Sequence, residues 1–229
     1  MSERRSRRQA ALEPDELEAA VPRGRQAWLS LLVVGVLVAA VIGSGLLISH
    51  ALAPAVPSAL ADCQTSTQIA PHTYIGRQPM CITASQKLQA TITTTQGDVV
   101  LLLHPEVAPV TVNNFVILAT HGYYNGLTFW DSESWEIQGG DPLGNGRGGP
   151  GYSLPDEPQS TPWALGSVGM ARVPGGAING SQFFIEKGEW PSPGPKAIYN
   201  QFGTVISGMD KVQLLSTSDS ILSITIKVS

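Results

Sequence analysis

The stretch VNNFVILATHGYYNGLTF, residues 112–129, changes its pattern halfway along. Its first half carries apolar side chains at positions i, i+3, i+4 and i+7, namely Val112, Phe115, Val116 and Ala119. This spacing is typical of a helix with one buried face. Pro109 suits the first turn of such a helix, and Gly122 suits its end. The stretch therefore predicts a helix that covers a core.

Short β-rich runs surround this helix on both sides. LQATITTT and DVVLLLH flank Gln96-Gly97 and predict a hairpin. Near the C-terminus, four apolar residues alternate with polar ones, which predicts a strand with one buried face: Leu222, Ile224, Ile226 and Val228. Residues 208–217, GMDKVQLLST, suggest a second short helix. Many short strands with only two helices indicate a mainly β domain, an antiparallel barrel capped by helices.

The N-terminal quarter of the chain has the pattern of a membrane anchor. Residues 27–48 form a run of 22 residues without a charge, about 33 Å long as a helix and enough to cross a hydrocarbon core. Six arginines precede this run, whereas residues 49–76 contain no Lys or Arg. We therefore expect a single-pass protein of the cell membrane, with a cytoplasmic N-terminus and an extracytoplasmic C-terminal domain.

Two alternatives remain open in this region. A cleaved signal peptide competes with the anchor, because Ala59-Leu60-Ala61 resembles a cleavage site. We favour the anchor, since the apolar run is longer than a usual signal core. Cys63 and Cys81 fall on the outer side, where disulfides persist, although two unpaired thiols are the other possibility.

These patterns divide the chain into four parts. They are a disordered cytoplasmic tail (1–26), a transmembrane helix (27–48), an extracytoplasmic linker with both cysteines (49–87) and a globular domain (88–229). We expect this domain to be monomeric.

Composition excludes several classes of function. The net charge is −4 and only 14% of the residues are charged, so no basic surface is expected for nucleic acid. No Cys/His cluster has metal-ligand spacing, and no motif for a cofactor is found, so we expect neither a metal nor a cofactor.

Five segments together resemble the cyclophilin family of peptidyl-prolyl isomerases over nearly all of residues 88–229. They are VNNFVILATHGYYNGLTF (112–129), IQGGDPLGNGRGGPGY (137–152), LGSVGMA (165–171), NGSQFFI (179–185) and FGTVISGMD (202–210). The resemblance implies an eight-stranded antiparallel barrel with a helix over each open end. It also implies a groove that binds proline-containing polypeptides and interconverts the cis and trans forms of X-Pro bonds, without a cofactor.

The resemblance also implies the residues of this groove. Gln138 matches a glutamine that grips the peptide and orients a catalytic cation, and Arg172 is a hypothetical replacement for that cation. The positions expected to bind substrate are Trp135, Gln138, Ala171, Arg172, Phe184, Trp190 and Tyr199. Glu136 replaces an apolar residue and would bring charge to the edge of the proline pocket.

The chain departs from the family where the catalytic arginine is expected. In relatives, His-Arg follows the phenylalanine that matches Phe129, and the arginine donates to the prolyl nitrogen. Here the next residues are Trp130-Asp131-Ser132-Glu133-Ser134, one residue shorter than in relatives, which leaves Asp131 or Ser132 at the arginine's position. Losing one preorganised donor commonly costs about 10²- to 10³-fold in rate.

The resemblance therefore leaves two classes of function open. One is a weakened prolyl isomerase that acts on extracytoplasmic proteins. The alternative is a non-catalytic module, tethered to the membrane, that binds proline-containing peptides in the same groove. A structural tether with a vestigial groove is a third and weaker reading.

Overall fold

The computed structural model describes residues 55–157, 162–172, 175–190 and 199–229. The expected cytoplasmic tail, the expected transmembrane helix and the start of the linker lie outside these residues. In the part of the chain that is described, no helix is both long and apolar enough to cross a membrane.

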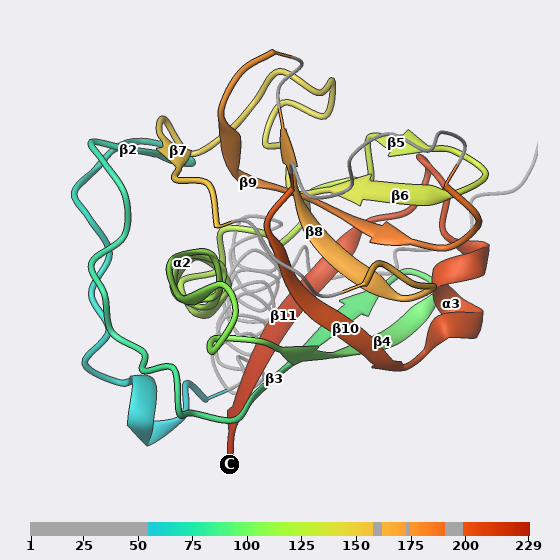
Figure 1. Cartoon of the computed structure of the whole chain (residues 1–229). Helices are drawn as coiled ribbons and strands as arrows, with labels where there is room; N and C mark the ends of the chain where they lie inside the picture. The colour runs from blue at the N-terminus through green and yellow to red at the C-terminus, as the bar shows by residue number, and fades with distance from the viewer. Residues whose placement is uncertain (1–54, 158–161, 173–174, 191–198) are drawn as a thin grey trace, which may run out of the picture. The chain divides into compact units, whose positions relative to one another are not determined.

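The described chain is mainly β, with two α-helices (Figure 1). The helices are α2 (Pro109–Thr120) and α3 (Met209–Leu214), and a short 3₁₀ turn covers Ser58–Leu60. The strands are β1 (Gln68–Ala70), β2 (Thr73–Tyr74), β3 (Leu88–Thr94), β4 (Gly97–Leu103), β5 (Asp131–Ser132), β6 (Glu136–Gly139), β7 (Ser153–Leu154), β8 (Ser167–Arg172), β9 (Ile178–Glu186), β10 (Gln201–Ser207) and β11 (Ile221–Val228). Both predicted helices and the hairpin of β3 and β4 are confirmed.

The large sheet is antiparallel and curls into a half-barrel. Its strands follow the order β11-β3-β4-β10-β8-β9-β6-β5, with β7 paired to β9 outside this path. Among the described residues, one isolated bridge, Thr128 to Ser220, joins the segment before β5 to the segment before β11. The expected eight-stranded barrel is thus a curled half-barrel, and this bridge and a few neighbouring backbone hydrogen bonds link the segments next to the two ends of its eight-strand path.

Helix α2 lies against the sheet, with all of its residues 111–119 buried, while α3 lies at the far side of the domain (Figure 1). Phe115 of α2 is completely buried and its ring lies 5.8 Å from that of Phe183 on β9 and 5.1 Å from that of Phe202 on β10. The side-chain amide of Asn114 donates to the carbonyl of Gly180 at 2.7 Å. These contacts fix β9 against the core, and β9 is the strand on which the candidate site is built.

The C-terminal strand differs from its prediction at one position. Ile224 and Ile226 are buried as expected, but Leu222 is 52% exposed. The pairing of β11 with β3 shifts register between Ile221 and Ser223. A bulge of this kind turns one side chain out of the alternation, so Ile221 takes the buried place instead and is fully covered.

The segment before β3 packs on the same core. Leu60, Cys63, Tyr74 and Ile82 all belong to the buried cluster. Cys63 and Cys81 form a disulfide across 18 positions of sequence, which resolves the open pairing in favour of the bridge. Asn113 of α2 accepts the backbone N–H of Cys81 at 2.7 Å through its side-chain oxygen, and its amide donates to the carbonyl of Pro79. The bridge is therefore tied to the helix that supports the sheet.

Candidate active site

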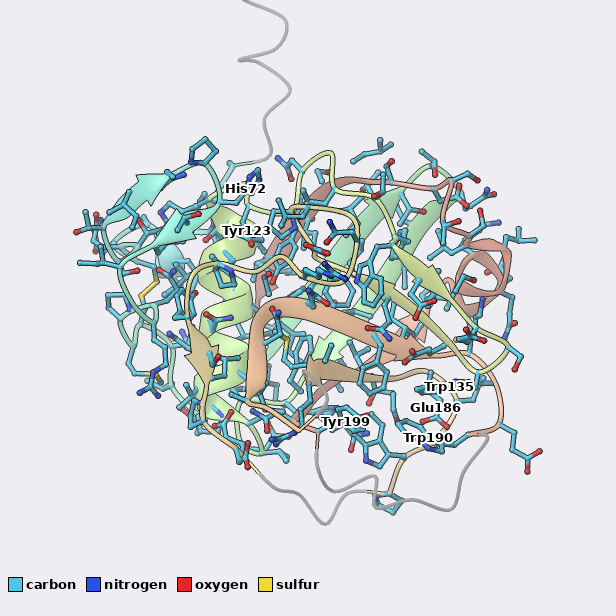
Figure 2. The ribbon with its side chains drawn as sticks, turned by 90° about the horizontal axis from the view of Figure 1, so that it is seen from above. His72, Tyr123, Trp135, Glu186, Trp190 and Tyr199 are labelled. Atoms are coloured by element: carbon cyan, nitrogen blue, oxygen red, sulfur yellow. A yellow bond between two sulfur atoms is a disulfide. The ribbon has the colours of Figure 1, made fainter. Side chains whose placement is uncertain are left out.

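Four of the expected groove residues meet in one aromatic cluster. The ring of Phe184 lies 6.0 Å from Trp135, 6.1 Å from Trp190 and 5.3 Å from Tyr199, with interplanar angles between 65° and 77°. Trp135 and Trp190 approach each other to 4.1 Å. Figure 2 shows Trp135, Trp190 and Tyr199 gathered at one side of the domain, away from His72 and Tyr123. The structure thus brings together residues that lie up to 64 positions apart in the sequence.

The strand register explains why Phe184 stands at the centre of this cluster. On one side of β9, Gln138 of β6 lies opposite Phe184, and on the other side Gly169 of β8 does so. The row continues to Asp131 of β5, opposite Gln138, and to Gln201 of β10, opposite Gly169. Directly opposed residues of antiparallel strands project to the same face of the sheet. One face therefore presents Asp131, Gln138 and Phe184 in succession.

Glu136 adds a buried carboxyl group to this face. It lies two residues before Gln138 on β6 and is only 3% exposed. The side-chain amide of Gln138 donates to one of its carboxyl oxygens. The pKa of Glu136 is raised from 4.5 to about 7, chiefly by burial. The hydrogen bond from Gln138 and the charge of Lys187 oppose this rise, and the negative charges of Asp131 and Glu133 contribute to it. The carboxyl group can thus change its charge close to neutral pH.

The two residues that could stand in the arginine's place have different surroundings. Asp131 faces Gln138 across the β5–β6 pair. Ser132 lies opposite Ile137, and its hydroxyl accepts a hydrogen bond from the ammonium of Lys187 at 3.0 Å. Only Asp131 is therefore in register with the row that contains Gln138 and Phe184.

Arg172 and Ala171 lie at the end of β8. Arg172 donates to the carboxylate of Asp156 at 2.5 Å and to the carbonyl of Gly176 at 2.8 Å, and its side chain is 19% exposed. Burial and the charge of Glu136 raise the pKa of Tyr199, and the positive charge of Arg172 opposes this rise. Arg172 is thus close enough to act on the cluster electrostatically, while its guanidinium group is engaged by Asp156. Ala171 is 9% exposed.

A fifth ring of the cluster, Trp163, was not expected from the sequence. Its indole stacks on Phe184 with a centroid distance of 5.4 Å and an interplanar angle of 14°. It also lies 6.2 Å from Trp190 and 6.3 Å from Tyr199. Trp163 is outside every recognised motif. The one sequence signal for it is Gly169, because a glycine inside a strand often marks the close approach of another group.

Comparison with known proteins identifies the domain. The family model for cyclophilin type peptidyl-prolyl cis-trans isomerase/CLD matches residues 89–227. The chain belongs to the cyclophilin family. The match runs from the second residue of β3 to the last but one of β11, and it agrees with the family expected from the five segments.

Individual cyclophilins are similar over the same part of the chain. Peptidyl-prolyl cis-trans isomerase B of Bacillus subtilis is 41% identical over 120 residues, which are 51% of this chain and 82% of that protein. A peptidyl-prolyl cis-trans isomerase of Synechococcus elongatus is 38% identical over 141 residues, 60% of this chain and 95% of that protein. These relatives support assignment to the class of cyclophilin-type isomerases.

Solved cyclophilin structures share the fold. A cyclophilin type peptidyl-prolyl cis-trans isomerase of Cryptosporidium parvum aligns with a TM-score of 0.55 and 28% identity, covering 62% of this chain and 98% of its own. A second structure of that protein, in the presence of the dipeptide Ala-Pro, aligns with a TM-score of 0.54 and 29% identity, covering 61% and 98%. The half-barrel with two helices is therefore a cyclophilin fold.

Proposed function

We propose that this cyclophilin is a prolyl isomerase of low intrinsic activity that acts on extracytoplasmic proteins. The observation that carries the proposal is the row Asp131, Gln138 and Phe184 beside the aromatic cluster. It retains an aromatic surface for a proline ring and an amide side chain for the flanking backbone. It carries an acid in the place where we infer that relatives hold their arginine.

The aromatic surface can lower the barrier in part without that arginine. Amide resonance gives the planar X-Pro bond more charge separation than the twisted transition state has, and this resonance underlies the barrier of about 18 to 20 kcal/mol. An apolar surround favours the less polar twisted form, which is a contribution from desolvation. Asp131 acts in the opposite direction, because a negative charge near the prolyl nitrogen opposes the lone pair that develops there.

Location outside the cytoplasm is supported by two independent features. The Cys63–Cys81 disulfide is of a kind that persists in oxidising compartments. The arginines before residue 27 and the absence of Lys and Arg from residues 49–76 agree with an anchor at residues 27–48 and an outer C-terminal domain. We infer that the client proteins are secreted or envelope proteins whose folding waits on proline isomerisation.

A non-catalytic peptide-binding module is the second candidate, and Asp131 is the observation that favours it. Titrating the full chain with the peptide Ala-Ala-Pro-Phe measures binding, and a protease-coupled assay of the same peptide measures turnover. We expect measurable binding and a rate above that of the uncatalysed peptide. Binding without any turnover would decide for the module, and neither binding nor turnover would contradict both functions.

A further inference from the structure

Phe184 is almost inaccessible although it stands at the centre of the aromatic cluster, where the family resemblance places the proline site. Only 1% of the residue is exposed. The rings of Trp135, Trp190 and Tyr199 meet it with interplanar angles of 65° or more, whereas the indole of Trp163 covers it face to face. A proline ring could reach the face of Phe184 that Trp163 covers only by taking the place of this indole.

Gly169 makes room for the indole. A Cβ atom at this position would lie 2.5 Å from Cη2 of Trp163 and 2.8 Å from Cζ of Phe184. Any other residue would therefore push against both rings. The indole of Trp163 thus rests directly on the backbone of β8 at Gly169, which belongs to the same cross-strand row as Phe184 and Gln138.

Trp163 is held in this place by ring packing. Within the described ranges, its side chain contacts Phe184, Trp190 and Tyr199 and makes no hydrogen bond. The chain directly after it is anchored, because the backbone N–H of Ala164 donates to Ser167 Oγ at 3.0 Å and that of Ser167 donates to the Ala164 carbonyl at 2.8 Å. The indole can therefore leave by side-chain rotation while this turn keeps its structure.

We propose that Trp163 occupies the proline site of the free protein and that an X-Pro segment binds by displacing it. Trp163 is then a residue that sets the affinity of the site for proline-containing peptides. The inference rests on the proposed function, since a groove that receives no proline would have nothing to displace the indole.

The expected size of the effect follows from the energy of ring stacking. The apparent affinity equals the intrinsic affinity multiplied by the fraction of molecules whose site is open. One aromatic pair contributes an amount that corresponds to about a two- to tenfold change in an equilibrium constant. Removing the indole should therefore tighten peptide binding by about that factor, whereas the rate of the bound peptide should change little.

The test compares Trp163→Ala with the parent, using the full chain in mild detergent and the peptide Ala-Ala-Pro-Phe. We expect Kd and KM to fall about two- to tenfold in the variant, with kcat nearly unchanged. Trp163→Phe keeps a ring over Phe184 and should stay close to the parent. Leu165→Ala is the matched control, because Leu165 lies two residues further on and is 58% exposed.

Thermal unfolding of each variant shows whether the domain is intact, and Trp163→Leu replaces Trp163→Ala if the latter does not fold. Equal or weaker binding by the Ala or Leu variant, compared with the parent, would overturn the proposal. If the parent still turns over the peptide, the proposed isomerase function is unaffected by that result. A fall in kcat with unchanged KM would also overturn it, because it would make Trp163 part of the catalytic surface. Peptide binding by neither parent nor variant would overturn this inference and the proposed function together.

Discussion

Asp131 lies directly opposite Gln138 in the antiparallel pair of β5 and β6. In the same row, Gln138 lies opposite Phe184, the ring at the centre of the aromatic cluster. The amide of Gln138 meanwhile donates to Glu136. Gln138, to which the family resemblance assigns the orienting of a cation, thus lies between two acids, Asp131 and Glu136. The acids that replace the expected residues of the family are therefore the physical reason for the inferred weakness of catalysis.

Replacing Asp131 by Arg should raise kcat/KM in the peptide assay. The substitution removes a charge that opposes the lone pair on the prolyl nitrogen and supplies a donor, and one donor of this kind contributes about 10²- to 10³-fold. Asp131→Asn removes only the charge and should give a smaller gain. Glu133→Arg is the control, since it places a cation on an exposed residue two positions further on, directly after β5. Equal kcat/KM for Asp131→Arg and Glu133→Arg would contradict a specific role for residue 131.

Glu136→Gln should stabilise the domain above neutral pH. Below about pH 4.5 the carboxyl group is protonated in both the folded and the unfolded state, so its titration does not change the free energy of unfolding. Between pH 4.5 and about 7 the unfolded state loses this proton first, because burial raises the folded-state pKa to about 7, and the free energy of unfolding falls. The loss is complete above pH 7 and amounts to roughly 3 kcal/mol.

Denaturant unfolding between pH 4 and 8.5 measures this effect. The difference in stability between Glu136→Gln and the parent should grow from pH 4.5 to 7 and then stay constant. Glu189→Gln, at an exposed position, serves as the control. Parallel pH profiles for the parent and Glu136→Gln would show that folding does not change the pKa of Glu136.

The sequence predicted those features that depend on local pattern. The period of apolar residues located α2, and the motif NGSQFFI located the strand that carries Phe184. The bulge that exposes Leu222 depends on how β11 pairs with β3, which no local alternation reveals. The small hairpin of β1 and β2 was missed because its segment lacks periodicity, and it packs as part of a segment tied down by the disulfide.

The candidate site was predictable to the extent that motifs carried it. Trp135 and Phe184 were placed by the family resemblance, and their rings do meet. Trp163 comes from a segment that matches no motif, so its stacking on Phe184 follows only from the folded chain. The ion pair of Arg172 with Asp156 is likewise set by the fold, since Asp156 lies 16 residues away in the sequence.

Arg172→Ala tests whether this arginine replaces the missing donor in part. If its charge assists the reaction, kcat/KM should fall about two- to tenfold, the size of one hydrogen bond. Asp156→Asn should act in the opposite direction, because it releases the guanidinium group from its ion pair. Arg147→Ala is the control, since Arg147 is an exposed arginine in another loop. Equal rates for Arg172→Ala and the parent would remove Arg172 from the mechanism.

Reduction of the Cys63–Cys81 disulfide should lower the stability of the domain. The bridge closes a loop across 18 positions, and a loop of this length contributes about 3 kcal/mol in the chain-entropy model. For a domain of this size that corresponds to a fall in Tm of roughly 6 to 12 °C. Thermal unfolding with and without reductant measures the change. The double variant Cys63→Ala/Cys81→Ala should have the Tm of the reduced parent in both conditions. Equal Tm values for the oxidised parent and the double variant would contradict this prediction. They would mean that the Asn113 contacts and the buried Leu60 hold this segment on the sheet without help from the bridge.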